Sequence, residues 1–180
     1  VKFEADIGAW IMPFVMAAIN TRVVRRSHAL AGYPYGKDFQ YEEAMVSGKG
    51  LIGRLKGYAG LAALGAIMAG KPDSLYKKVL NQFFPKPGEG PDKEEREAGF
   101  YKFIVVGVFR DGEIITAEIA GDRDPGYGST SKMLGESAAC LALDKDKTPQ
   151  VSGVLTPSIA MGDSLLERLE NHAGLSFTIN

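Results

Sequence analysis

A change in hydrophobic period near residue 100 constrains this fold more than any other feature of the sequence. Residues 100–110 and 113–121 alternate with a period of two and are rich in Val, Ile and Phe, which is typical of β-strands. Asp111 and Gly112 lie between the two runs, and an Asp-Gly pair in that position is a strong hairpin signal. Both faces of the first run are apolar, which predicts a sheet covered on both sides. The hairpin therefore predicts an α/β or α+β fold, with helices flanking a mixed β-sheet.

On both sides of the predicted hairpin in the sequence, apolar residues recur at helical spacing. A helix is expected to begin near Pro13, because Pro fits the first turn of a helix, and the glycine-rich turn at residues 32–36 ends it. Residues 39–46 fit either a strand or the start of a helix. Further helices are predicted over residues 51–69, 73–84, 92–99, 129–143 and 157–172, and residues 175–179 would add an edge strand.

Local signals mark the ends of several of these helices. Asp92 followed by Glu95 is a capping-box pattern, and Ser and Thr residues are expected to cap the helix that begins near residue 129. That helix is expected to be buried, because its apolar residues cover much of its circumference. Residues 85–91 are rich in Pro and Gly and predict an extended connection, with a sub-boundary near residues 85–99.

The composition excludes several classes of function. The 180 residues carry 21 Lys and Arg against 22 Asp and Glu, whereas a nucleic-acid-binding domain usually has a basic excess. The single cysteine, Cys140, excludes an internal disulfide framework and is expected to be a buried structural thiol. His28 and His172 give no metal-ligand spacing, so no metal is expected. Residues 57–70 form the longest uncharged apolar run, which is shorter than the roughly 20 residues of a membrane span; we expect a cytoplasmic protein.

Residues 48–53 read Gly-Lys-Gly-Leu-Ile-Gly, which matches the G-x-G-x-x-G pattern of dinucleotide sites. Such a site needs a buried strand directly before it and an acidic strand end about 20 residues later. Residues 41–46 are too polar for that strand, and Pro72-Asp73 predicts a turn, so the pattern favours the start of a helix. The following small residues favour a crowded core helix, with dimerisation or membrane-surface contact as the alternative.

A basic cluster is predicted on the first helix. Arg22, Arg25 and Arg26 share one face, because residues three and four apart are neighbours on a helix. No acidic residue lies within four positions of any of them. A guanidinium can bind two oxygens of a phosphate or carboxylate, and Asn20 would add a side-chain amide. Two interpretations stay open: an anion site, or a solvated face whose charges pair with acids distant in sequence.

A second polar cluster lies where a glycine-rich loop, residues 121–128, runs into a helix. The first turn of this helix carries Ser129, Thr130, Ser131 and Lys132. Backbone N–H groups and the dipole at a helix N-terminus attract anions, and plain capping is the alternative. The sequence identifies no proton donor, and Tyr127 and Lys132 are the catalytic candidates that it offers.

Four stretches of the sequence resemble the saccharopine dehydrogenase-like oxidoreductases, and in particular their trans-acting enoyl reductase branch. In the family's order, they are WIMPFVMAAINTRVVRRS at 10–27, PKPGEGP at 85–91, DPGYGSTSKMLGESA at 124–138 and GVLTP at 153–157. The resemblance implies an α/β region that packs on an N-terminal Rossmann domain and builds the substrate cleft. Because only this second region is matched, and because the chain begins with Val, we expect residues 1–180 to be the C-terminal substrate-side domain of a longer chain.

The resemblance also implies a function. It implies that the full-length protein is an NAD(P)-dependent oxidoreductase that transfers hydride to or from a small or lipid-linked substrate. On this view the region alone is inactive and holds no cofactor tightly, and both polar clusters are candidate contacts to substrate, cofactor phosphate or the absent Rossmann domain. Two alternatives remain: a non-catalytic module that dimerises or docks on membranes through residues 51–69, and an independent anion-binding domain.

Overall fold

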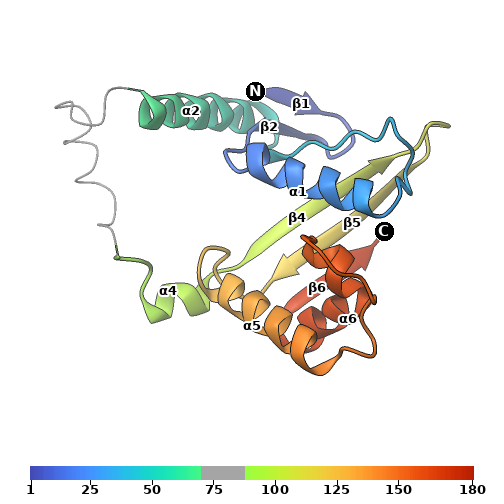
Figure 1. Cartoon of the computed structure of the whole chain (residues 1–180). Coiled ribbons are helices and arrows are strands. Elements are labelled where there is room, and N and C mark those ends of the chain that lie inside the picture. Colours follow the sequence, from blue (N-terminus) through green and yellow to red (C-terminus); the bar gives the residue numbers. More distant parts are fainter. Residues whose placement is uncertain (70–87) are drawn as a thin grey trace. The chain divides into compact units, whose positions relative to one another are not determined.

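The computed structural model describes residues 1–69 and 88–180 (Figure 1), which form two compact units. Residues 1–26 and 35–90 make the first unit, and residues 27–34 and 91–180 make the second. Each unit holds one three-stranded antiparallel sheet. The helix expected at residues 73–84 and most of the connection at 85–91 lie outside the described residues.

The fold is α+β, and the prediction of a mixed sheet is wrong. In each sheet two strands are neighbours in sequence, β1 (Lys2–Glu4) with β2 (Ala9–Pro13), and β4 (Tyr101–Val108) with β5 (Ile114–Gly121). Short turns join these pairs, and short turns permit only antiparallel pairing. The third strand, β3 (Ala44–Gly48) or β6 (Leu175–Ile179), arrives by a long connection and also pairs antiparallel.

The prediction that a helix begins near Pro13 is also wrong. Pro13 ends strand β2, and helix α1 (Ala17–Leu30) follows it. Strand β1 pairs with β2 only as far as Ile11, so at Pro13 the only neighbour is β3. Proline is tolerated where one side of a strand has no ladder to complete. The turn at residues 32–36 ends α1 as predicted, and the undecided residues 39–46 lead into β3.

Helix α2 (Gly50–Met68) confirms the helix predicted over residues 51–69 and packs on β2 and β3 (Figure 1). Its buried face is made of glycines. A Cβ on Gly53 would overlap the carbonyl group of Gly48, and a Cβ on Gly57 would lie 2.8 Å from Val1. Small residues therefore allow the helix to lie directly against the sheet, and this face is used within the first unit.

The second unit confirms the local signals around the predicted hairpin. Strands β4 and β5 pair along their whole length, and Gly112 in the turn has φ +88°. Before them, helix α4 (Lys93–Ala98) begins with the predicted capping box: Glu95 N–H donates to the Asp92 carboxylate at 2.8 Å, and Asp92 N–H donates to Glu95 at 3.1 Å. Strand β6 adds the predicted edge to β5.

Helices α5 (Gly128–Leu143) and α6 (Pro157–His172) pack on each other around Cys140, Met161 and Leu165. Cys140 is fully buried, as predicted, and this burial raises the pKa of its thiol. The expectation that α5 is buried is wrong for part of its surface, because Leu134 and Leu141 are exposed.

The second sheet is not covered on both sides, contrary to the prediction from its two apolar faces. Phe103, Ile104 and Val108 on β4 are exposed. Two contacts join this sheet to the helices: the Tyr101 hydroxyl bonds to Ser129 on α5, and α6 packs on β6. Helices α5 and α6 therefore leave several apolar residues of this sheet exposed.

Candidate functional site

The loop before α5 is organised by one carboxylate. Asp124 accepts hydrogen bonds from the backbone N–H groups of Gly126 at 3.0 Å, Tyr127 at 2.9 Å and Gly128. These bonds, with the one from Tyr127 the strongest influence, hold the pKa of Asp124 below its usual value. The N-terminus of α5 therefore already faces a negative charge that the chain itself supplies.

The hydroxyl groups of the first turn are committed to other bonds, so the expected Ser and Thr capping of α5 is wrong. Thr130 donates to the carbonyl of Pro125 at 2.7 Å, and Ser131 donates to the carbonyl of Gly128 at 2.9 Å. Ser129 is fully buried and shares a 2.8 Å hydrogen bond with the Tyr101 hydroxyl. In this arrangement all three hydroxyls stabilise the loop and the start of the helix.

The two catalytic candidates lie in different surroundings. Lys132 Nζ contacts both carboxylate oxygens of Asp122, at 3.1 and 3.2 Å. Asp122 is held in turn by its backbone N–H, which donates to the carbonyl of Gly174 at 3.2 Å. Tyr127 is exposed at the helix start. Lys132 therefore has a fixed position, whereas the Tyr127 ring faces solvent.

Sequence reasoning missed Asp122 and Asp124, although a signal for the second was present. An Asp directly before Pro-Gly favours a turn in which the carboxylate accepts nearby backbone N–H groups. The glycines of residues 121–128 drew attention to the loop rather than to its carboxylates. The partner of Lys132 had no comparable signal, since Asp122 lies ten positions away.

Replacing Asp124 separates its capping role from its charge. Asp124→Ala is expected to destabilise the second unit at neutral pH, because three N–H groups lose their acceptor. The depressed pKa means that Asp124 contributes stability above about pH 4, and that this contribution is lost as the pH falls through the folded-state pKa. Thermal unfolding between neutral and acidic pH measures this effect. Asp124→Asn keeps one acceptor oxygen and should flatten the acid dependence, and an unchanged acid dependence would contradict the assignment.

The predicted basic cluster lies on α1. Its three guanidinium groups, those of Arg22, Arg25 and Arg26, are exposed, and Arg25 approaches the carbonyl of Tyr41 at 3.5 Å. Asn20 donates to Glu43 at 2.9 Å. An acid distant in sequence therefore reaches the amide of this cluster.

Glu43 also affects the pKa of the neighbouring Tyr41. The Tyr41 hydroxyl donates to Glu43 at 3.0 Å, and burial followed by this carboxylate raises the pKa of Tyr41 to about 12. Tyr41 therefore serves as a hydrogen-bond donor to Glu43 beside α1.

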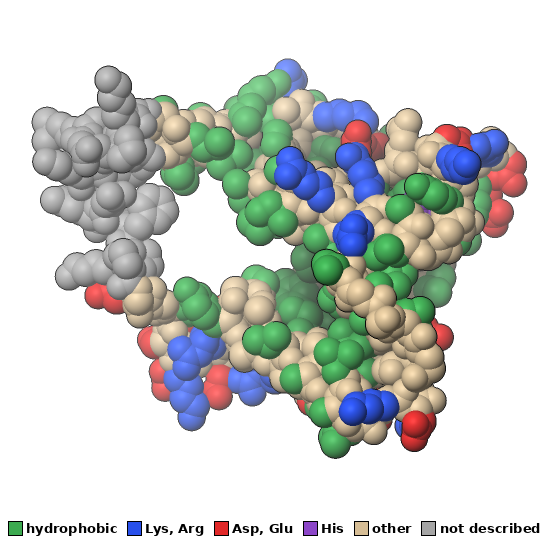
Figure 2. Space-filling view, viewed as in Figure 1, with side chains coloured by type: hydrophobic (Ala, Val, Ile, Leu, Met, Phe, Trp, Pro, Cys, Tyr) green, Lys and Arg blue, Asp and Glu red, His purple; other side chains and the backbone are tan. Residues whose placement is uncertain are grey.

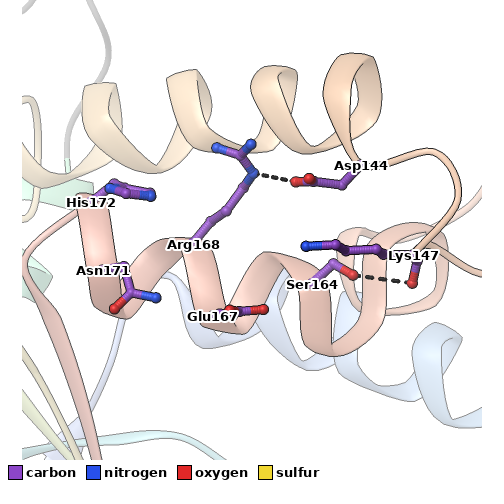
Figure 3. Close-up of a pocket in the computed structure, with 7 residues that line it drawn as sticks. All are labelled: Asp144, Lys147, Ser164, Glu167, Arg168, Asn171 and His172. Carbon is purple, nitrogen blue, oxygen red and sulfur yellow. Dashed lines mark hydrogen bonds and ion pairs between the residues drawn. The ribbon is translucent and has the colours of Figure 1, made fainter.

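A small polar cavity of about 120 Å³ lies between the end of α5 and α6 (Figure 3). Arg168 extends from α6 to donate to Asp144 and, at 2.9 Å, to Glu136. These three side chains are each about one fifth exposed. The hydrogen bond to Arg168 lowers the pKa of Asp144. The Arg168 guanidinium is already paired with two carboxylates, so it links α5 to α6 and is not available to an anionic ligand.

A larger groove of about 600 Å³ lies where the loop after α5 meets the first turn of α6. We call it the α5–α6 groove. Its apolar lining comes from Leu141, Pro149, Val151, Leu155 and Ala160, and its polar lining comes from Lys145, Thr148, Gln150 and Ser152, with Gly153. This volume falls in the range of small-molecule sites. Leu141 and Val151 in its lining are about half exposed, so this is an open surface groove with both apolar and polar walls.

The loop that walls this groove is shaped by Gln150, whose amide donates to the carbonyls of Lys145 at 2.7 Å and Thr148 at 3.0 Å. No signal in the sequence indicated this groove. Among the described residues, no cluster of His, Cys, Asp and Glu could hold a metal ion.

The glycine pattern at residues 48–53 does not fit a dinucleotide. A strand, β3, does lead into it, contrary to the expectation from its polar sequence. However, β3 is an antiparallel edge strand, whereas a dinucleotide site needs a parallel βαβ unit. Gly48 and Gly53 also contact each other, so backbone fills the turn where a pyrophosphate would lie.

Comparisons with known proteins give a consistent similarity. A protein of Mycobacterium tuberculosis (strain ATCC 25618 / H37Rv) that is provisionally named a trans-acting enoyl reductase is 42% identical over 170 residues. Proteins named trans-acting enoyl reductase from Mycobacterium ulcerans (strain Agy99) and Mycobacterium bovis (strain BCG / Pasteur 1173P2) are 41% and 39% identical, over 168 and 165 residues. Each match covers 90% of this chain and 39% of the relative.

The chain therefore spans about two fifths of the length of the curated relatives that it matches. No family model matches the chain, and no solved structure matches it. The similarity is to a region of proteins that carry an enoyl reductase name, and it extends over nearly all of this chain.

Proposed function

We propose that this chain is the substrate-side region of an NAD(P)-dependent, trans-acting enoyl reductase of the saccharopine dehydrogenase-like type. The observation that carries the proposal is the 39–42% identity over 90% of the chain to proteins of that name. Because the chain spans only 39% of those relatives, the remainder of such a protein is the natural place for a nucleotide-binding domain. The described glycine turn, which does not fit a dinucleotide, is consistent with this division.

The α5–α6 groove gives this region a role in binding. An enoyl group is a carbon–carbon double bond next to a carbonyl. An enoyl thioester therefore has an apolar hydrocarbon tail and a polar end at the carbonyl. Leu141, Val151 and Leu155 offer apolar walls, and Lys145 offers a cation at the rim. Burial of an acyl chain against such walls contributes roughly 0.8 kcal/mol per CH2 group. The groove would therefore select for chain length and hold the substrate for reduction.

The reaction itself adds a hydride and a proton across the double bond. The glycine turn at residues 48–53 does not fit a dinucleotide, so we assign it no part in hydride delivery. Lys132, which is fixed by Asp122, and Tyr127, which is exposed, remain the proposed proton-donor candidates. The α1 cluster of Asn20, Arg22, Arg25 and Arg26 remains a proposed contact to anionic parts of the substrate or cofactor.

A reductase assay tests the proposal. The full-length protein should oxidise NADPH or NADH only when a trans-2-enoyl thioester is present, and mass spectrometry should find the saturated thioester. Val151→Trp, which narrows the groove, is expected to raise KM about ten-fold for a long-chain substrate and much less for a four-carbon one, since burying each CH2 contributes roughly 0.8 kcal/mol. Val154→Trp is the matched control, because Val154 is exposed in the same loop but does not line the groove.

Two results would count against this function. If no enoyl thioester, carried on coenzyme A or on an acyl-carrier protein, is reduced with either nicotinamide, the activity is wrong. If residues 1–180 alone bind NADPH with micromolar affinity, the assignment of this chain to the substrate side is wrong.

A further inference from the structure

Helix α2 exposes large apolar side chains on the face that points away from its sheet. With glycines packed inward, Leu51, Ile52, Leu55 and Tyr58 are 70%, 69%, 60% and 49% exposed. Figure 2 shows hydrophobic side chains gathered along α2 on the face in view. Single exposed apolar residues are normal on a protein surface, but a continuous stripe of this kind marks an interaction surface.

The charge around this stripe has one sign. Residues 44–69 contain no Asp or Glu, whereas Lys49, Arg54 and Lys56 are all present. At 100° per residue, Arg54 and Lys56 fall on opposite sides of the stripe that runs through Leu51, Leu55 and Tyr58. An apolar stripe flanked by cations, on a helix without acids, complements a surface that is apolar inside and negatively charged at its boundary.

Two aromatic rings lie beside Arg54, on one side of the stripe. The Arg54 guanidinium lies 5.2 Å from the centre of the Trp10 ring and 5.9 Å from that of Tyr58. Trp and Tyr favour the boundary between lipid headgroups and acyl chains. Arg54 is thus held beside two rings of the kind that favour this boundary.

We propose that α2 lies in the plane of an anionic lipid bilayer and binds it through this stripe. By length and composition α2 is also able to cross a membrane. However, its glycine face contacts β2, β3 and Val1, and a helix that crosses the bilayer would have to leave that sheet. The surface-bound orientation keeps these contacts. The proposal does not depend on the reductase activity and is tested without any substrate.

Vesicle flotation tests the proposal. The purified full-length protein should float with vesicles of phosphatidylcholine that contain about 30% phosphatidylglycerol, because this lipid gives the vesicles an anionic surface. It should bind pure phosphatidylcholine at least about ten-fold more weakly. The double variant Leu51→Glu, Leu55→Glu should lose binding, because two carboxylates oppose both insertion and surface charge. Leu134→Glu is the matched control, since Leu134 is 70% exposed on α5 in the second unit, and it should bind like the unchanged protein.

The charge contribution has its own variant. Lys49→Glu with Lys56→Glu should weaken binding to the anionic vesicles by more than about ten-fold and leave the weak binding to neutral vesicles unaltered. Circular dichroism of each variant shows that the fold is retained. Failure of the unchanged protein to float, or equal loss of binding in the Leu134→Glu control, would overturn the proposal.

A labelling experiment distinguishes binding of the stripe to lipid from coverage of the stripe by protein. Cys140, the only cysteine of residues 1–180, is fully buried, so any labelling of Leu55→Cys above that of the unchanged protein reports on the stripe. A polarity-sensitive fluorophore attached there should shift to the blue when anionic vesicles are added. A thiol that resists labelling before lipid is added would show that the protein itself or a second copy covers the stripe, which overturns the proposal. Resistance of the bound protein to carbonate extraction would show a spanning helix and would equally overturn it.

Discussion

Gly53→Ala is expected to lower the free energy of unfolding of the first unit by about 3 kcal/mol, the upper part of the range for overpacking. The added methyl group would overlap the carbonyl of Gly48 at the point where β3 turns into α2. Neither partner is the end of a flexible side chain, so the strand and the helix would have to separate. The usual gain from replacing a helical glycine by alanine is too small to offset this cost.

Gly65→Ala in the same helix is the matched control. A Cβ there would meet nothing within 4 Å, so the substitution should stabilise α2 by about 1 kcal/mol. The two variants should therefore shift the urea midpoint in opposite directions. Fluorescence of Trp10, which is the only tryptophan in the chain and lies in β2, reports on the first unit. A Gly53→Ala protein as stable as the Gly65→Ala protein would show that the strand and helix do not meet as described.

Elements defined by local signals could be predicted from the sequence, and elements defined by distant partners could not. The Asp-Gly hairpin, the capping box at Asp92 and the end of α6 before Gly174 each depend on residues a few positions apart. Pro13 shows the limit, because proline suits both the first turn of a helix and the end of a strand with one neighbour. Pairing of β2 with β3, more than thirty positions away, decides between them.

The candidate site shows the same division. The cluster at the start of α5 was visible in the sequence, but its hydroxyls and N–H groups turn inward because Asp124 and Pro125 offer nearer partners. The α5–α6 groove had no sequence signal, since its walls are brought together by packing of α5 on α6. Cys140 was correctly predicted as buried because its neighbours in the helix are apolar.

Arg168→Met is expected to destabilise the second unit strongly at neutral pH. The change keeps much of the apolar volume of the side chain but leaves Glu136 and Asp144 as two carboxylates without their shared cation. Removing one partner of a partly buried ion pair costs more than the intact pair contributes, because the remaining carboxylates stay partly shielded from water. Lys102→Met is the matched control. Its pair with Glu118 is much more exposed, and the loss should be less than about 1 kcal/mol.

The stability difference between Arg168→Met and the unchanged protein is expected to depend on pH. Because Arg168 lowers the pKa of Asp144 in the folded chain, their interaction contributes stability above about pH 4 and loses it as the pH falls through the folded-state pKa. The gap between Arg168→Met and the unchanged protein should therefore be widest near neutral pH and close in acid. Reaction of the Cys140 thiol with a thiol reagent measures opening of the second unit, because this single cysteine is fully buried between α5 and α6. A gap that stays constant between neutral and acidic pH would mean that Arg168 acts through packing alone, and that the ion pairs do not hold α5 against α6.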